Sequence, residues 1–256
     1  MARVYLCQDN ITGLYSALYD AWMECRQSGD AEIELLDQYE ERLFCEYIEC
    51  QASEKKAAAI HQLLMNHLGE QVYRILYYAA LSYEADKGNA IWGTMLVARR
   101  MTNPQRVMDH LTEESVRRTF ELYRQVSNEA HFFKEILRFK ELESGILYAK
   151  IAPKSQVLTT IAPHFENRLP LENWMIYDET HRHIVVHEKK RRWIQVLGVD
   201  VDSEQFENLS QEELEIERLW KGFFTSISIK ERESRRRQLQ HFPIWYRKNA
   251  VEFESP

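Results

Sequence analysis

The chain has 256 residues, of which 45% are hydrophobic and 29% charged, with only 8 glycines and 6 prolines. This composition excludes collagen-like, low-complexity and disordered classes, and the length suits one large domain or two small ones. No apolar run approaches the ~20 residues of a membrane span. The first residues, MARVYLCQDN, lack the pattern of a signal peptide. We therefore expect a cytoplasmic protein without a membrane partner.

The first half of the chain has mainly helical apolar spacing. It predicts strands over 2–7 and 44–50, and helices over 10–27, 55–68, 71–85 and 113–141. Asn10 is a candidate N-cap for the first helix. Gly69 separates the second helix from the third, and the stretch from Gly88 to Gly93 is expected to interrupt the chain before a further short helix.

The second half changes to the period of two that is typical of strands. It predicts strands over 146–153, 174–179, 183–188 and 192–197, and helices over 155–168, 211–227 and 230–240. The last three strands are joined by tight polar turns and indicate an antiparallel meander. The expected fold class is α+β. Residues 1–142 form a mainly helical region with two short strands, and 143–256 a sheet with helices, either as two regions or as one continuous domain.

Sequence motifs for cofactors, metals and catalysis are missing. The sequence holds no GxGxxG, GxxxxGK[ST], GxSxG or HExxH pattern. The four cysteines are scattered and are expected to be reduced, buried thiols. His183 and His187 lie about 13 Å apart along a strand and cannot share an ion, so these histidines, with His181, are expected to be exposed hairpin residues. We expect no metal and no cofactor.

Charge is segregated along the chain, although the net charge is −7. Residues 30–54 hold nine acidic side chains against one basic, and 203–219 hold six against one. Residues 230–248 hold seven basic side chains against two acidic, and 181–192 hold five against one. Such segregation fits either a one-sided surface for a polyanion or ordinary solvated faces.

Polar residues of the predicted helix 113–141 share one stripe. Asn128, His131, Lys134 or Glu135, and Arg138 follow helical spacing beside the apolar residues. The stripe is either a solvent face with ion pairs, or a groove for an anion in which His131 could donate a proton.

A second pair of cationic residues, His164 and Arg168, stands four residues apart near a helix end. The helix dipole alone favours cations there. Alternatively, they face His131 and Arg138 across one cleft, with Trp174 available to stack on a base. We predict this shared cleft.

The C-terminal stretch combines basic and aromatic side chains. It contains Arg235, Arg236, Arg237, Trp245, Tyr246, Arg247 and Lys248. Phosphate contacts with base stacking are typical of nucleic-acid grooves, while a packed aromatic tail is the alternative.

The chain resembles a family of bacterial proteins described as probable DNA metabolism proteins, which are built around a domain of unknown function. The resemblance runs from about residue 3 to 254 through the ordered segments VYLCQDNITGLYSALYDAW, NEAHFFKEILRFKE, GILYAKIAP, IAPHFENRLPLENWMIYDETHR and LWKGFFTSISIKERES with the tail after it. The residues that fall on its motif positions are His131, Lys134, Arg138, His164, Arg168, Trp174 and Asp178. The tail departs from the family, because Ile244 and Trp245 follow Pro243 where members often carry basic residues.

The resemblance implies an accessory role. Members of the family are typically encoded beside a radical S-adenosylmethionine (radical SAM) protein thought to repair or modify DNA, and a related domain is fused to some uracil-DNA glycosylases. The expected function is a DNA repair or modification accessory that binds nucleic acid, docks the radical SAM partner, or does both. The alternatives are an enzyme acting on nucleic acid itself, glycosylase- or nuclease-like, through His131 or His164, and a pure protein-interaction adaptor.

Overall fold

The computed structural model of the chain describes residues 2–199, 209–216 and 219. The chain divides into two compact units, and the division falls between Asn128 and Glu129, inside helix α4 (Glu114–Ile136). The expected α+β class, with a helical N-terminal half and a C-terminal sheet with helices, is confirmed. Among the described residues, no helix is long and apolar enough to cross a membrane.

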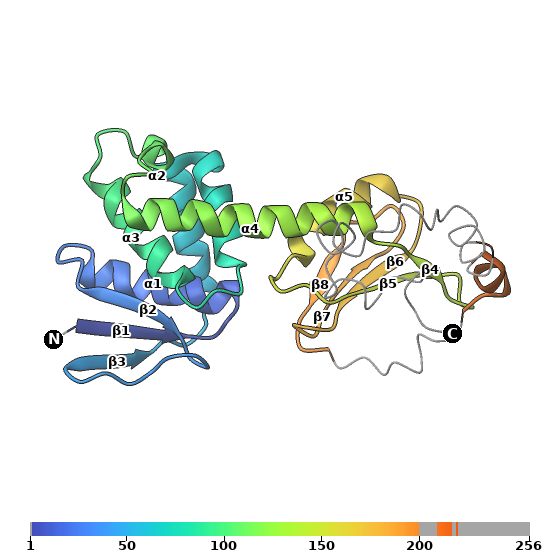
Figure 1. Cartoon of the computed structure of the whole chain (residues 1–256), viewed down its shortest axis with the longest axis horizontal. Coiled ribbons are helices and arrows are strands. Elements are labelled where there is room, and N and C mark those ends of the chain that lie inside the picture. The colour runs from blue at the N-terminus through green and yellow to red at the C-terminus, as the bar shows by residue number, and fades with distance from the viewer. Residues whose placement is uncertain (1, 200–208, 217–218, 220–256) are drawn as a thin grey trace, which may run out of the picture. The chain divides into compact units, whose positions relative to one another are not determined.

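The first unit combines a small parallel sheet with helices (Figure 1). Its elements are β1 (Ala2–Cys7), α1 (Ile11–Cys25), β2 (Ala31–Leu35), β3 (Cys45–Glu49), α2 (Glu54–Ala80), α3 (Lys87–Arg100), the 3₁₀ helix η1 (Pro104–Asp109) and the first part of α4. The strand order is β2-β1-β3, and β1 pairs in parallel with both neighbours. The predicted N-cap is confirmed, because the Asn10 side chain accepts a hydrogen bond from the backbone of Gly13 at 2.7 Å.

Strand β2 was not predicted, and the sheet therefore has three strands in this unit rather than two. Its sequence, AEIEL, alternates apolar and acidic residues, and Ala31, Ile33 and Leu35 are buried. The period of two is that of a half-buried strand. This alternation lies within the acidic block 30–54, whose high charge is not typical of a strand in a buried sheet.

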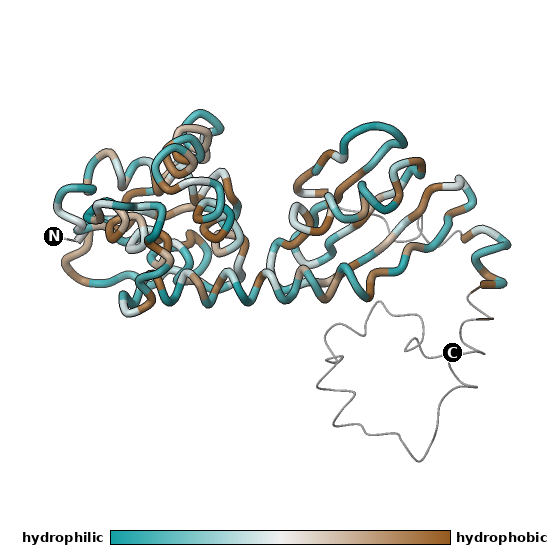
Figure 2. The backbone as a smooth tube through the Cα atoms, turned by 90° about the horizontal axis from the view of Figure 1, so that it is seen from above, coloured by the Kyte–Doolittle hydropathy of each residue, from teal (hydrophilic) through white to brown (hydrophobic). Residues whose placement is uncertain are grey.

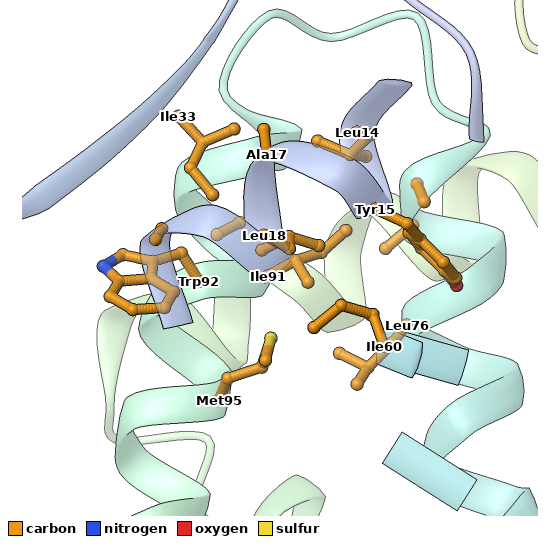
Figure 3. Packing of buried hydrophobic residues seen from close by; sticks show 14 of the residues in the cluster. Leu14, Tyr15, Ala17, Leu18, Ile33, Ile60, Leu76, Ile91, Trp92 and Met95 are labelled. Atoms are coloured by element: carbon orange, nitrogen blue, oxygen red, sulfur yellow. The ribbon is translucent and has the colours of Figure 1, made fainter. Parts of the chain in front are cut away.

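Helices α1 to α3 build the core of the first unit together with β2. Figure 3 shows Leu14, Leu18 and Ile91 in this cluster. Gly69 has φ of 80° and kinks α2, as the predicted separation of two helices requires.

Two glycines that were expected to break the chain lie inside α3 instead. A Cβ on Gly88 would stand 2.7 Å from the side chain and the carbonyl oxygen of Ile33, and one on Gly93 would stand 2.5 Å from Ser115 Cβ. These glycines allow α3 to approach β2 and α4 closely. Tertiary packing, rather than a turn, explains both residues.

The second unit is a five-stranded sheet with helix α5. Beyond the last part of α4, its elements are β4 (Lys140–Glu141), β5 (Leu147–Ile151), α5 (Leu158–Arg168), β6 (Trp174–Asp178), β7 (His183–His187) and β8 (Ile194–Val196). The strand order is β4-β5-β6-β7-β8. The predicted meander is confirmed for β6, β7 and β8, but β5 and β6 are parallel, so the sheet is mixed. The parallel pairing arises because α5 crosses over between these two strands.

Helix α4 is amphipathic, and teal and brown alternate along it (Figure 2). It ends at Ile136, five residues before the predicted end at 141. Lys140 and Glu141 instead pair with β5 as strand β4. The ring of Phe139 packs against Phe165 at 5.3 Å between centroids. These contacts in the second unit outweigh the local helical pattern.

Candidate nucleic-acid interface

Basic side chains gather where α5 ends and the turn between β7 and β8 packs beside it. The backbone N–H of Lys190 donates to the carbonyl of Pro170 at 2.9 Å. The backbone N–H of Lys189 donates to Asn173 Oδ1 at 3.0 Å. These bonds hold the turn against the segment that connects α5 to β6.

A third bond ties the turn to α5 itself, since the backbone N–H of Trp193 donates to the Glu166 carboxylate at 3.3 Å. Lys190 has φ of 64°, in the left-handed region that a lysine rarely adopts. The exposed cationic residues at this end of α5 and in the turn are Arg168, Lys189, Lys190, Arg191 and Arg192. A fixed turn therefore presents four consecutive cations beside the last residue of α5.

Lys134 and His164 extend this cationic group. Burial lowers the pKa of His164, and the nearby charges of Lys134 and Arg168 lower it further. Burial also lowers the pKa of Lys134. Lys134, in the last turn of α4, therefore acts electrostatically on the same histidine as Arg168 of α5, as neighbours of like charge do.

The unsatisfied ring nitrogen of His164 makes this position unusual. His164 Nε2 is buried and has no hydrogen-bond partner among the described residues. No carboxylate of the described part of the chain forms an ion pair with Lys134 or Arg168. Buried polar atoms in native proteins are usually satisfied. An anion placed here would meet two cations and a polar ring atom.

We define the basic surface as Lys134, His164, Arg168, Lys189, Lys190, Arg191 and Arg192. Three acidic side chains belong to the same region. Glu166 is engaged with the turn, Glu188 pairs with Arg191 at 2.8 Å, and Glu172 is exposed in the segment between α5 and β6. Six lysine and arginine residues against three glutamates leave the surface positive, which is the electrostatic requirement for binding a polyanion.

His131 and Arg138, which the sequence predicts to share a cleft with His164 and Arg168, both have carboxylate partners in the structure. His131 has an exposed side chain, and its Nε2 lies 3.2 Å from the Glu135 carboxylate. Arg138 lies beyond the end of α4 and donates to Glu213 at 2.7 Å. Glu213 is buried and also accepts from the backbone of Glu141. Arg138 thus forms a structural ion pair. Of the predicted polar residues of this helix, Lys134 is the one whose charge lowers the pKa of His164.

Trp174 is a core residue, which corrects its expected role as a stacking platform. Its side chain is fully buried. Its ring stacks on His187, with centroids 4.9 Å apart and an interplanar angle of 9°. Phe139 and Phe165 pack against the same ring. A base has no access to Trp174 in this structure.

The hairpin histidines are not all exposed as expected. His187 is buried, and its Nδ1 lies 3.0 Å from the carbonyl oxygen of Glu172. His181 Nδ1 lies 2.6 Å from the fully buried carboxylate of Asp178, which also accepts from the backbone N–H groups of Thr180 and His181. Among the described residues, no group of three or more His, Cys, Asp or Glu side chains could hold a metal ion.

The candidates of the C-terminal tail, Arg235, Arg236, Arg237, Trp245, Tyr246 and Arg247, lie outside the described residues. The four cations Lys189 to Arg192 are additional to the site residues that the sequence predicts. Their sequence signal is the basic block 181–192, and the structure adds that this turn packs against the segment after Arg168.

The described residues form an α+β protein of two units, and the second unit carries the basic surface. The DUF4130 family, described as a domain of unknown function, matches residues 85–252, and the chain belongs to this family. No curated protein matches the sequence. The match includes α3, η1, α4 and the whole basic surface, while β1, α1, β2, β3 and α2 lie outside it.

Proposed function

We propose that this protein binds nucleic acid through the basic surface of its second unit. The observation that carries the proposal is the convergence of Lys134, His164 and Arg168, beside a fixed turn with four further cations. When lysine and arginine side chains bind phosphates, the counterions that were condensed on the nucleic acid are released. This release dominates the non-specific affinity of proteins for nucleic acids. Bidentate guanidinium contacts also suit phosphate geometry.

Partial burial of Lys134 favours a phosphate at this point. A cation that has already lost part of its hydration loses little more when an anion replaces the remaining water. His164 is mostly neutral at pH 7, and its unsatisfied Nε2 can donate a hydrogen bond in one tautomer. The exposed cations of the turn would then contact neighbouring phosphates of the same strand.

Salt-dependent binding tests the proposal. We expect the triple variant Arg168→Gln, Lys189→Gln, Arg192→Gln to weaken binding of a fluorescein-labelled DNA duplex at every sequence tried. The slope of log affinity against log salt should flatten by roughly 0.9 for each lost phosphate contact. The control variant Lys55→Gln, Arg74→Gln, Arg124→Gln removes the same charge from exposed positions elsewhere, and should keep the slope. Equal weakening in both variants, or no binding by the wild-type protein at low salt, would refute the proposal.

The biological role that we propose is that of an accessory protein in DNA repair or modification, with the chemistry performed by a separate radical SAM enzyme. The support is the resemblance of the ordered sequence segments to the bacterial family described above. The basic tail residues Arg235, Arg236 and Arg237 would add to the cationic footprint. Co-purification of untagged protein with a radical SAM protein from its own cells tests the partnership, and consistent absence of such a protein would contradict it.

Catalysis by the protein itself is the competing function. Among the described residues, His164 offers a specific feature in its favour, because its imidazole has a pKa lowered by burial and by the charges of Lys134 and Arg168 and could exchange a proton beside a bound phosphate. Release of a base or cleavage of a strand by the purified protein, abolished by His164→Gln, would favour this alternative. An accessory protein binds DNA and leaves it intact in the same assay.

A further inference from the structure

The most exposed large hydrophobic side chains of the described residues are neighbours in the first unit. Leu43 is 86% exposed and Phe44 is 83% exposed. Phe44 also has φ of 65°, in the left-handed region where a bulky aromatic residue is a genuine outlier. Such backbone strain, of order 1–3 kcal/mol, persists only where the surroundings impose it, and it often occurs at binding sites.

The loop before these residues is anchored, so their exposure is not the result of a frayed end. The backbone N–H of Arg42 donates to the Tyr47 hydroxyl at 2.6 Å. The Arg42 guanidinium donates to Glu32 at 2.5 Å and to Glu34 at 2.6 Å, both on β2. Arg42 is thus fixed to two strands of the sheet, and the next two residues are held out in solvent.

Phe44 leads directly into β3, an edge strand among the described residues. The backbone of Cys50, just after β3, donates to Leu6 of β1. Because backbone groups alternate in direction along a strand, the N–H and C=O groups of Cys45, Tyr47 and Glu49 point away from β1. No strand of the described part of the chain pairs with this side of β3, which leaves it a template for another strand.

The negative charge around the β3 edge favours a basic binding partner. Residues 30–54 carry nine acidic side chains against one basic, and the one base, Arg42, is already paired with two glutamates. Glu46 and Glu49 of β3 are exposed, and Glu46 pairs with Arg3 of β1 at 3.2 Å. A second copy of the chain would bring one strongly negative edge against another, and like charges directly opposite each other destabilise strand pairing. A basic segment meets no such barrier.

We infer that the edge of β3, together with Leu43 and Phe44, docks an extended basic segment of a partner protein, which adds to the sheet as a strand. Backbone hydrogen bonds to Cys45, Tyr47 and Glu49 would provide affinity, as in other cases of β-strand addition. Glu46 and Glu49 lie on opposite faces of the sheet, and the basic side chains of the segment would face Glu49. An apolar side chain of the segment would cover Leu43 and Phe44. This surface shares no residue with the basic surface of the second unit.

A labelled peptide tests the inference with the full-length protein. The probe is a fluorescein-labelled peptide of eight residues that alternate between lysine and valine, and binding is followed by fluorescence anisotropy. We expect saturable binding that weakens as salt rises. The double variant Leu43→Ser, Phe44→Ser should bind at least tenfold more weakly. The control variant Leu111→Ser, Leu171→Ser changes two exposed leucines elsewhere, and should bind as the wild-type protein does.

Two altered peptides separate the parts of the inference. Methylation of alternate backbone nitrogens removes the donors needed for strand pairing, and replacement of lysine by glutamate reverses the charge. We expect both changes to abolish binding, and binding should slow hydrogen exchange at the amides of Cys45, Tyr47 and Glu49. Absence of binding by the wild-type protein, equal binding by the Leu43/Phe44 variant or by either altered peptide, or self-association through Leu43 and Phe44 in sedimentation, would overturn the inference.

Discussion

The ammonium group of Lys87, 1% exposed, donates to the carboxylate of Asp9, so that the first turn of α3 is joined to the loop after β1. Lys87 also donates to the carbonyl of Ser82 at 2.6 Å. Asp9 keeps about a third of its side chain exposed, at 33%. Lys87 is therefore shielded from water while Asp9 is not. Removing one charge or the other should change the free energy of unfolding by different amounts.

We predict that Asp9→Asn destabilises the first unit more than Lys87→Met does. Asp9→Asn leaves an uncompensated charge at a fully buried position, where such a loss costs roughly 3–5 kcal/mol. Lys87→Met removes the lysine charge and leaves the Asp9 carboxylate without this partner, but water can still reach that carboxylate. Urea unfolding followed by circular dichroism measures both losses. A larger loss for Lys87→Met would show that packing of the lysine stem matters more than its charge.

The free energy of unfolding should depend on pH through His164. Its folded pKa lies below its unfolded value of about 6.5, so the unfolded chain binds more protons between these two values. The linkage relation then requires stability to fall as pH drops through 6.5 toward the folded pKa, and to be insensitive to this group above 6.5. Unfolding curves for the wild-type protein and His164→Asn between pH 5 and 8 measure the difference, and a smaller pH dependence in the variant is expected.

The pKa of His164 should also depend on the charges of Lys134 and Arg168. We expect Lys134→Gln and Arg168→Gln each to raise the His164 pKa, because each removes a repelling positive charge. Titration of the His164 ring resonances by NMR measures this shift. Arg124→Gln, which removes an exposed cation from the first unit, is the control. An unchanged pKa in both variants would mean that burial alone lowers it.

The glycines inside α3 should not tolerate even one methyl group. Gly93→Ala places its Cβ against the Ser115 side chain, and overpacking of this kind typically costs about 1–3 kcal/mol. Combination with Ser115→Gly should recover part of the loss. Gly88→Ala should be worse, because its Cβ meets the backbone oxygen of Ile33, which cannot be trimmed away. Equal losses in thermal unfolding would contradict this ranking.

Thiol labelling should separate the cysteines by burial. Burial raises the pKa of Cys7 and of Cys50 to about 12, so neither forms thiolate at pH 8 in the folded protein. Cys25 is buried, whereas Cys45 is partly exposed. We expect one thiol, Cys45, to react quickly with a disulfide reagent and the other three only after unfolding. Cys45→Ser should remove the fast phase, and its persistence would contradict the assignment.

Local sequence was sufficient for much of this fold. The periods of two and of 3.6 located β1, β3, β5, β6, β7, β8 and the main helices to within a few residues, because each element must bury one regularly spaced face. The Asn10 cap and the Gly69 kink were also readable, because both depend on the chemistry of single residues. Strand β2 was readable in principle, since AEIEL alternates.

Relationships between distant residues were decided only by the tertiary structure. Glycines at 88 and 93 resemble breaks in the sequence, and only contact with Ile33 and Ser115 shows that they serve close packing. The parallel pairing of β5 with β6 depends on where α5 crosses over.

The candidate site shows the same division. The sequence shows the basic block 181–192, but it does not show that the turn between β7 and β8, which carries this block, packs beside Arg168. Nor can it say that Arg138 is paired with Glu213, 75 residues away. Hydrophobic periodicity is a local property, whereas the pairing of charges depends on which segments meet after folding. The sequence by itself therefore determined the elements and the sign of their charge, and the tertiary structure decided which of those charges are already paired.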